Sequence, residues 1–294
     1  MPPNTLQRNI VLGIGLMILA VFLFPLKDAF AKMTGGYYSA ILVVWAQFVF
    51  TGGIYLLVIV IRHGPGVLRP AAPLMQILRA AFAVAGMGAF YWAITLIPLA
   101  EATAMQFIAP LVVTALSPLF LGEQLGWRRW LSVVAGFVGV LIVLRPEFGG
   151  ERFGYGVALL SGLFLGLCFI MNRKLAHVAS PIKSVAYSAC LGAIMITPLV
   201  PSVWIMPRAE DLPLILGFLG VSLLGQTCLF TAFHYGQASV VAPFHFVQII
   251  GATLFGYLFF SEFPDTTRFA GIAVIILAGV YIAMREAKKS RATA

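Results

Sequence analysis

Charged side chains are scarce in this sequence of 294 residues. Asp, Glu, Lys and Arg together make up 10% of it, whereas 61% of the residues are hydrophobic. Soluble domains carry roughly 25% charged residues, so a water-soluble fold built from this chain would lack a polar surface. We therefore expect an integral membrane protein whose immediate partner is the lipid bilayer.

Catalytic motifs are missing as well. The chain contains no Gly-x-x-x-x-Gly-Lys-Ser/Thr phosphate loop, no His-Glu-x-x-His zinc motif and no Gly-x-Ser-x-Gly nucleophile motif. These motifs support ATP hydrolysis, metal-dependent hydrolysis and acyl transfer. No paired carboxylates are expected at mid-membrane for acid–base chemistry either. We predict that the protein is not an enzyme and needs no cofactor.

Cysteine is also rare. The three cysteines, Cys168, Cys190 and Cys228, all lie in apolar runs. Their spacing fits neither a metal site nor a disulfide between loops. We interpret them as packing residues and expect no metal.

Long apolar runs are what the sequence has in abundance. A transmembrane helix needs about 20 mostly apolar residues, and ten runs approach or exceed this length. They lie at 8–26, 37–61, 73–96, 100–122, 127–145, 155–173, 182–205, 212–235, 239–260 and 267–285. The loops between them leave no room for a soluble catalytic domain. The prediction is an all-α integral membrane fold with ten transmembrane helices.

The two halves of the chain repeat each other. An offset of 139 residues places Glu123 on Glu262, each after a small residue at the end of a predicted span. The predicted boundary divides the chain into 1–146 and 147–294, each a repeat of five helices. Because an odd number of crossings inverts the second repeat relative to the first, the pattern predicts an alternating-access transporter.

Lysine and arginine are unevenly distributed, and cytoplasmic loops usually hold the excess. With the N-terminus inside, 13 of the 19 lysines and arginines lie on the cytoplasmic side. We predict that both termini are cytoplasmic and that the protein spans the inner (plasma) membrane. The net charge of +9 then reflects topology and contact with anionic lipid, so no nucleic-acid partner is expected.

The N-terminal segment permits a second interpretation. Arg8, an apolar run and Ala29-Phe30-Ala31 resemble a secretory signal with its cleavage site. Cleavage would leave nine spans and break the match between the repeats. We therefore expect the segment to be retained as the first span.

Motifs in both halves carry a family resemblance. The first half contains Ala104-Met105-Gln106-Phe107-Ile108-Ala109-Pro110 and Gly122-Glu123-Gln124-Leu125, and the second contains Ala238-Ser239-Val240-Val241-Ala242-Pro243 and Gly279-Val280-Tyr281-Ile282. From about residue 10 to 287 the chain resembles the drug/metabolite transporter (DMT) superfamily with its ten-helix EamA-type architecture. Within it, the chain is most similar to the YddG-type amino acid exporters. The resemblance implies transport of a small molecule, since members carry amino acids, drugs, nucleotide sugars and other metabolites.

Polar and aromatic residues at mid-span are the candidates for solute contacts, because a polar side chain in a membrane needs a cavity or a partner. We expect them to line a central cavity formed mainly by the third, fourth, eighth and ninth spans. The expected substrate-binding residues are Trp45, Tyr91, Gln106, Phe230, His234, His245, Phe246 and Gln248, with Gln47 offered by the second span. Each also has a structural interpretation, as interface anchor or as packing between helices.

The end of the first span supplies a candidate gate. Pro25 would bend the helix, and Lys27 and Asp28 follow it, with Asp28 spaced to pair with Lys32. The alternative is an ordinary helix end with interfacial charges. Glu262 is expected to cap the next helix or to pair with Arg268.

The predicted function is a secondary transporter that exports small metabolites by alternating access, with amino acids, including aromatic ones, as the favoured solutes. One chain suffices for a complete pathway. Drugs, nucleobases or sugars are alternative solutes, and a lipid scramblase is an alternative of another class. The small four-helix relatives in the superfamily couple to protons through a carboxylate in the middle of the first helix. We expect none in the first span, which argues against that mechanism.

Overall fold

The computed structural model describes residues 3–64, 72–121, 127–144, 152–175, 181–235 and 242–292. Within these ranges nearly every residue is helical and none lies in a strand. Apolar runs fold this way in a bilayer because no water satisfies the backbone there, and a helix pairs its own N–H and C=O groups. The predicted all-α membrane fold is confirmed.

The helices of the first half follow the predicted spans, with two differences. They are α1 (Pro3–Thr34), α2 (Ala40–His63), α3 (Pro73–Leu96), α4 (Leu99–Gln106), α5 (Ala109–Leu121) and α6 (Trp127–Leu144). Helix α1 continues through Pro25, beyond the predicted end of the first span at residue 26. The fourth predicted span is divided into α4 and α5 by a turn at Phe107 and Ile108.

The second half contains several short 3-10 segments beside its long helices. Its elements are α7 (Arg152–Leu175), α8 (Pro181–Ile196), η2 (Thr197–Leu199), α9 (Val200–Val203), η3 (Ala209–Asp211), α10 (Leu212–Tyr235), η4 (Ala242–Val247), α12 (Gln248–Phe260) and α13 (Thr266–Ala292). The ninth predicted span thus begins as the 3-10 helix η4 and continues as α12.

Seven helical segments among the described residues are long and apolar enough to cross a bilayer. They are Val11–Thr34, Ala40–Ile61, Pro73–Leu96, Leu99–Phe120, Arg152–Leu175, Val185–Val203 and Ala209–Leu229. Three shorter apolar helices lie at the other predicted spans: Val133–Ile142, Phe244–Phe260 and Thr266–Tyr281. Each predicted span therefore corresponds to an apolar helical segment. The three short segments, at the fifth, ninth and tenth predicted spans, are shorter than expected.

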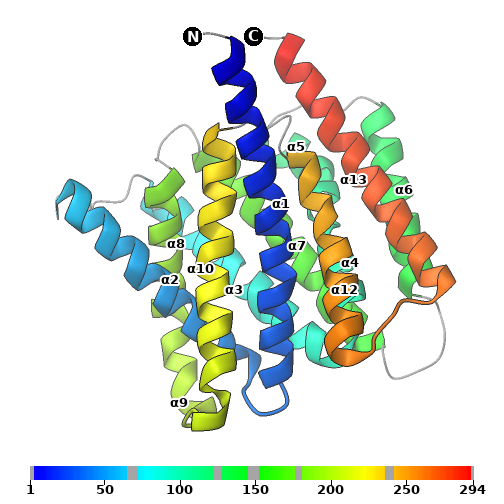
Figure 1. Cartoon of the computed structure of the whole chain (residues 1–294). Helices are drawn as coiled ribbons and strands as arrows, with labels where there is room; N and C mark the ends of the chain where they lie inside the picture. The colour runs from blue at the N-terminus through cyan, green and yellow to red at the C-terminus, as the bar shows by residue number, and fades with distance from the viewer. Residues whose placement is uncertain are drawn as a thin grey trace.

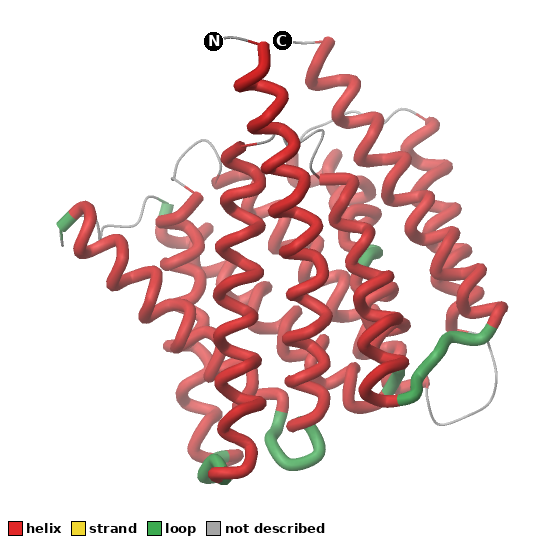
Figure 2. Tube along the Cα trace, in the orientation of Figure 1, coloured by secondary structure: helices red, strands yellow, loops and turns green. Residues whose placement is uncertain are grey.

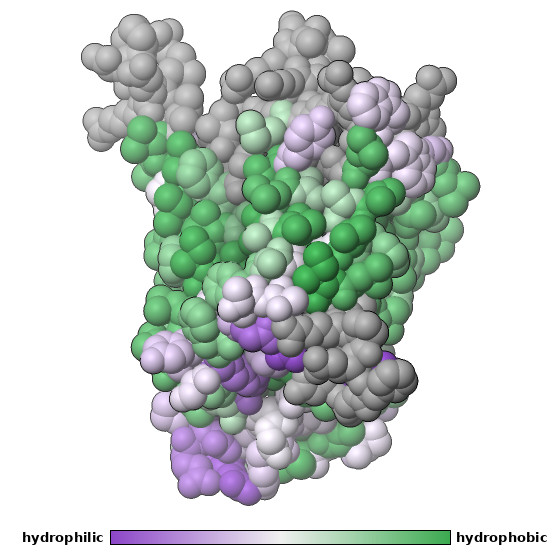
Figure 3. All heavy atoms as spheres, turned by 90° about the vertical axis from the view of Figure 1, so that its right-hand side faces the viewer, coloured by the Kyte–Doolittle hydropathy of each residue, from purple (hydrophilic) through white to green (hydrophobic). Residues whose placement is uncertain are grey.

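Both chain termini lie at the same end of the bundle, at the top of Figure 1. We call this the terminal end and the opposite one the far end. The α1–α2 loop, α9 and the α12–α13 connection lie at the far end (Figures 1 and 2). Figure 3 shows hydrophobic residues over the middle of one side and hydrophilic residues gathered toward the far end. This distribution suits a protein that spans a bilayer.

Helix α1 packs against α10 and α12 through small residues on its neighbours. A Cβ added at Gly225 of α10 would lie 3.2 Å from the Phe24 ring, and one at Gly251 of α12 would lie 3.1 Å from Pro25. Small residues allow such close approach between membrane helices. Pro25 therefore sits inside a packed helix pair and does not end α1.

Gly139→Val is expected to lower the thermal stability of the purified protein. A Cβ at Gly139 of α6 would lie 2.9 Å from the Gly271 carbonyl oxygen and 3.0 Å from the Ile275 nitrogen, both in α13. Overpacking of this kind costs about 1–3 kcal/mol, which differential scanning fluorimetry in detergent reads as a lower Tm. Gly156→Val is the matched control, because nothing lies within 4 Å of a Cβ there. Equal Tm values for the two variants would contradict the close α6–α13 packing.

Candidate functional site

Polar side chains from four helices meet in the interior of the bundle. We call them the buried polar network: Lys27 and Asp28 of α1, Gln47 of α2, Tyr91 of α3 and Ser222 of α10. Each of these residues is at most 8% exposed. Charged side chains within membrane spans are costly and rare, and they usually mark a pathway for solutes or ions.

Hydrogen bonds connect this network from α1 to α10. Lys27 Nζ pairs with the Asp28 carboxylate and donates to Tyr91 Oη at 2.8 Å. Tyr91 donates its hydroxyl proton to Gln47 Oε1 at 2.7 Å, and Gln47 Nε2 donates to Ser222 Oγ at 2.8 Å. Both charges are therefore compensated inside the protein, and the four helices are linked at this depth.

Aromatic rings surround the ammonium group of this network. Lys27 Nζ lies 5.1 Å from the centroid of the Tyr91 ring and 6.0 Å from that of Phe24, distances at which a cation is attracted to a ring face. The Tyr91 ring packs edge-on against Phe218 of α10, with centroids 5.8 Å apart. This packing holds the phenol in place beside the charged pair.

The position of Lys27 and Asp28 rules out one of the two interpretations of the end of the first span. They are not interfacial charges at a helix end, because α1 continues to Thr34 and both side chains are buried. Asp28 lies inside the segment Val11–Thr34, beyond its middle, and is 2% exposed, although the predicted first span ends at residue 26. Helix α1 continues past Pro25, and the proline ring packs closely against Gly251 of α12.

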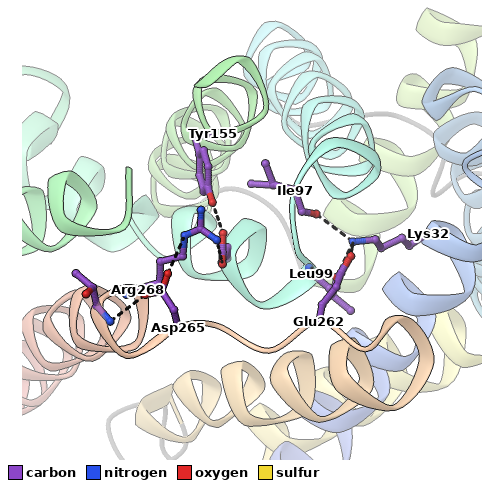
Figure 4. Close-up of polar contacts among 9 residues, drawn as sticks. Lys32, Ile97, Leu99, Tyr155, Glu262, Asp265 and Arg268 are labelled. Atoms are coloured by element: carbon purple, nitrogen blue, oxygen red, sulfur yellow. Dashed lines mark hydrogen bonds and ion pairs between the residues drawn. The ribbon is translucent and has the colours of Figure 1, made fainter. Parts of the chain in front are cut away.

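A second group of charges lies at the far end. Lys32 Nζ binds both carboxylate oxygens of Glu262 at 2.6 and 2.7 Å and donates to the Ile97 carbonyl oxygen at 3.0 Å. The Leu99 N–H at the start of α4 donates to Glu262 Oε2 at 3.1 Å, as Figure 4 shows. The predicted pairing of Asp28 with Lys32 is wrong, because each has another partner. Glu262 caps α4 rather than the helix that follows it.

Glu101, in the first turn of α4, is completely buried and has partners on two other helices. Tyr155 of α7 donates its hydroxyl proton to Glu101 Oε2, and Arg268 Nη1 of α13 lies 3.3 Å from Glu101 Oε1. Arg268 also approaches Asp265 Oδ2 at 3.9 Å (Figure 4). We call the charged groups here the far-end network: Lys32, Glu101, Glu262 and Arg268.

The predicted solute-binding residues fall into separate places. Tyr91 belongs to the buried polar network. Trp45, although on α2 with Gln47, donates from Nε1 to Thr197 Oγ1 at 3.0 Å and packs edge-on against Trp204 at 5.9 Å. Its side chain therefore lies with η2 and the residue after α9, and not with Tyr91.

Three other predicted residues gather at η4 and the start of α12. The ring centroid of Phe107 lies 5.8 Å from that of His245 and 5.1 Å from that of Phe246. Gln248, the first residue of α12, is 6% exposed. Gln106, at the end of α4, is half-buried beside Phe107. The turn between α4 and α5 thus meets η4, which also packs against the part of α1 that precedes Pro25.

Two predicted residues lie outside the described side chains: Phe230 and His234, although the α10 backbone that carries them is described. Glu123, the repeat partner of Glu262, lies outside the described residues altogether.

Two residues of these networks, Ser222 and Glu101, were not anticipated, and neither was Phe218, which packs against Tyr91. Ser222 is a lone hydroxyl in an apolar run, and nothing in its neighbourhood distinguishes it from a packing serine. Glu101 carried a usable signal, because a carboxylate at the start of an apolar run needs a cation nearby. Its partners come from residues more than 50 positions away, which one sequence does not reveal.

A groove of about 350 Å³ lies between α12 and α13. It is lined by Ile249, Ile250, Thr253, Leu254, Tyr257, Phe263, Phe269, Ile272, Ala273 and Ile276. No lining residue is charged, and Ile250 and Tyr257 are each 58% exposed, so this groove faces lipid. Across the described residues, no group of three or more His, Cys, Asp or Glu side chains is placed to hold a metal ion.

A bundle of apolar helices with compensated charges in its interior is typical of membrane transporters for small solutes. The EamA-like transporter family matches residues 11–145 and again residues 152–285. The chain belongs to this family, within the DMT superfamily, and is a multi-pass small-molecule transporter and not an enzyme.

Individual relatives are similar over nearly their whole length. The chain is 30% identical over 290 residues to an S-adenosylmethionine uptake transporter of Rickettsia felis, with 97% of each chain covered. It is 28% identical over 279 residues to a pseudopaline exporter of Pseudomonas aeruginosa, covering 94% of this chain and 97% of the exporter. A solved crystal structure superposes with a TM-score of 0.64 at 18% identity, covering 96% of this chain and 98% of the other, and it supports the fold.

Proposed function

We propose that the protein is a secondary transporter that exports small metabolites bearing an α-amino acid group, including amino acids with aromatic side chains. The observation that carries this proposal is the buried Lys27–Asp28 pair. An amino acid zwitterion presents one carboxylate and one ammonium group. Its carboxylate would take the place of Asp28 beside Lys27, and its ammonium the place of Lys27 beside Asp28.

The charge balance of the site favours a zwitterion over other solutes. When a neutral pair exchanges partners with a neutral zwitterion, every charge stays compensated. A solute that left one buried charge unpaired would meet a penalty of about 3–5 kcal/mol, the cost of breaking a buried ion pair. A sugar or nucleobase offers no charge that replaces either partner, and a phosphate brings excess negative charge to one lysine. These solutes are therefore the weaker candidates.

The rings near the pair suit an apolar or aromatic side chain. The Lys27 ammonium group lies near the rings of Tyr91 and Phe24, and the Tyr91 ring packs against Phe218. Aromatic groups pack favourably edge to face with such rings. We propose that the solute's side chain lies against them while the network holds its charged end.

The other predicted residues remain part of this proposal as a route between the buried polar network and the terminal end. The segment η4, which carries His245 and Phe246 and leads to Gln248, packs against the part of α1 that precedes Lys27 through Phe244 and Val247. We add Gln106, Phe230 and His234 to this route as candidate solute contacts. Trp45 is a candidate contact on the other side of the network, because its Nε1 donates to Thr197 of η2, next to α9 at the far end (Figure 1). The residue ranges 1–146 and 147–294 would act as inverted repeats that alternate access, in the inner membrane, with both termini cytoplasmic and one chain sufficient.

The relatives favour a second candidate, uptake of S-adenosylmethionine, because S-adenosylmethionine uptake transporters of four Rickettsia species are similar to most of the chain. This solute ends in the same α-amino and α-carboxylate groups, so the same pair would hold that end. Its sulfonium adds a positive charge that the pair does not compensate and that aromatic rings such as Phe24 or Phe218 would have to face. A lipid scramblase is less well supported, since the groove between α12 and α13 has no charged residue for a lipid headgroup.

Counterflow into proteoliposomes tests the proposal. Vesicles loaded with unlabelled phenylalanine are expected to accumulate external labelled phenylalanine, and a parallel set loaded with S-adenosylmethionine tests the second candidate. Phenethylamine lacks the carboxylate and 3-phenylpropionate lacks the ammonium group. We expect each to compete at least about tenfold more weakly than phenylalanine, because each leaves one member of the pair without a partner.

Empty liposomes and vesicles with an unrelated membrane protein control for leakage. Equal competition by all three compounds would refute recognition of the zwitterion. Failure of every amino acid and of S-adenosylmethionine to exchange, by protein that remains monodisperse, would refute the solute class and lead to nucleobases, sugars, drugs and lipids as the next panel.

A further inference from the structure

The far-end network joins parts of the chain that are distant in sequence. Lys32 and Glu262 are 230 residues apart, and Glu101 and Arg268 are 167 residues apart. Each pair links a residue in 1–146 to one in 147–294. The α12–α13 connection carries Glu262 and leads directly to Arg268 at the start of α13. Both links between the two parts are therefore made by one short segment.

The first turn of α4 lies between the two pairs. Leu99 donates its N–H to Glu262, and Glu101 accepts from Arg268. Leu99 is completely buried and Ile97, just before the turn, is 3% exposed. Figure 4 shows α4 held on one side by Lys32 and Glu262 and on the other by Tyr155 and Arg268. The ion pairs thus hold the buried residues Ile97 and Leu99 in place at this end of the bundle. We call these two residues the apolar plug.

The plug lies close to the buried polar network. Lys32 follows Asp28 by four residues on α1, about 6 Å along a helix axis. A solute bound at Lys27 and Asp28 would meet the Lys32–Glu262 pair one helical turn further toward the far end.

Ion pairs suit a contact that must open to water. The side chains of Lys32, Glu262 and Arg268 are 11%, 25% and 23% exposed, whereas that of Glu101 is 1% exposed. Charges regain hydration when they separate into water, which offsets part of the attraction that the pairs lose. An apolar seal of the same size would lose its burial on opening and would resist separation more strongly.

We propose that the Lys32–Glu262 and Glu101–Arg268 pairs form a latch that closes the far end over the buried polar network, and that both pairs separate when solute passes there. The structure is then the conformation closed at the far end. The latch concerns access rather than solute identity, so it holds for whatever small solute the protein carries. Switching between two closed arrangements of this kind is how transporters alternate access.

Thiol accessibility tests the latch without any solute. In a background with Cys168, Cys190 and Cys228 replaced by alanine, Ser222→Cys places a thiol in the buried polar network. A membrane-impermeant methanethiosulfonate is applied from either face, in right-side-out and inside-out vesicles. From the far-end face we expect Lys32→Gln or Glu262→Gln to speed labelling about tenfold or more, because the closed population falls. The matched control is Arg208→Gln with Glu210→Gln, an exposed far-end pair two residues apart.

Cross-linking supplies a second arm that does not depend on how a destabilised variant folds. Lys32→Cys with Glu262→Cys is bridged by a bis-methanethiosulfonate reagent, and counterflow is measured before linking, after linking and after reduction. We expect transport of whichever solute exchanges to stop on linking and to return on reduction. Linking Arg208→Cys to Glu210→Cys should leave it unchanged. The latch would be overturned if the cross-linked protein transported at its full rate. It would also be overturned if Lys32→Gln and Glu262→Gln left the labelling rate unchanged.

Discussion

Replacing Lys27 with Met or Asp28 with Leu, one at a time, is expected to abolish transport and to destabilise the protein by about 3–5 kcal/mol. The two side chains are 11% and 3% exposed, so either substitution leaves one charge without its partner in the interior. The Lys27→Met variant also deprives Tyr91 of the ammonium group that donates to it at 2.8 Å. Counterflow and thermal melting of the same preparations measure the two effects together.

The double variant Lys27→Met with Asp28→Leu separates binding from folding. Replacing a whole buried ion pair by apolar residues of similar size is often neutral for stability, or stabilising. We expect the double variant to regain most of the thermal stability that each single variant loses while transport stays at background. If instead transport returns together with stability, the pair is structural and the proposed mode of solute recognition is wrong. Arg208→Met with Glu210→Leu, on the exposed surface, is the matched control and should preserve both.

The sequence was sufficient for the membrane fold because its apolar runs have the length of a bilayer. The predicted spans at 73–96 and 212–235 coincide with α3 and α10. Proline was the main source of error. The sequence predicts a bend at Pro25 and an end of the first span at residue 26, yet α1 continues to Thr34, and Gly251 on the facing helix leaves room for the proline ring. A glycine on another helix is tertiary information that local pattern does not contain.

The same limit explains the site. Gln47 and Tyr91 stood out as polar or aromatic residues at mid-span, and both belong to the buried polar network. The sequence marks Lys27 and Asp28 as unusual but predicts them just beyond the first span, because the predicted span ends at residue 26 and α1 ends at Thr34. The pairing of Lys32 with Glu262 spans 230 residues, so it depends on how the two parts of the chain meet. Local spacing instead suggested a neighbour on the same helix.

Tyr91→Phe is expected to weaken solute binding while preserving the fold. The substitution removes one oxygen and leaves the ring, which still packs against Phe218. That oxygen accepts from Lys27 Nζ and donates to Gln47 Oε1 at 2.7 Å, so its loss frees the ammonium group and the amide together. A hydrogen bond to a charged group contributes roughly 1.5–3 kcal/mol, which corresponds to about a ten- to 150-fold rise in Kd.

Scintillation proximity binding of labelled phenylalanine, or of S-adenosylmethionine if that is the solute, measures the Kd directly. Tyr257→Phe on the lipid-facing side of α12, where the residue is 58% exposed, is the matched control and should leave the Kd unchanged. Far-end labelling of Ser222→Cys in the Tyr91→Phe protein then distinguishes weaker solute binding from opening of the latch. Among the described residues, Tyr91 forms hydrogen bonds with Lys27 and Gln47 and not with Lys32 or Glu262. The labelling rate should therefore equal that of the Ser222→Cys protein with Tyr91 intact. A Kd unchanged by Tyr91→Phe would mean that the phenol serves only to pack α3 against α10, and that the solute's charged end is held elsewhere.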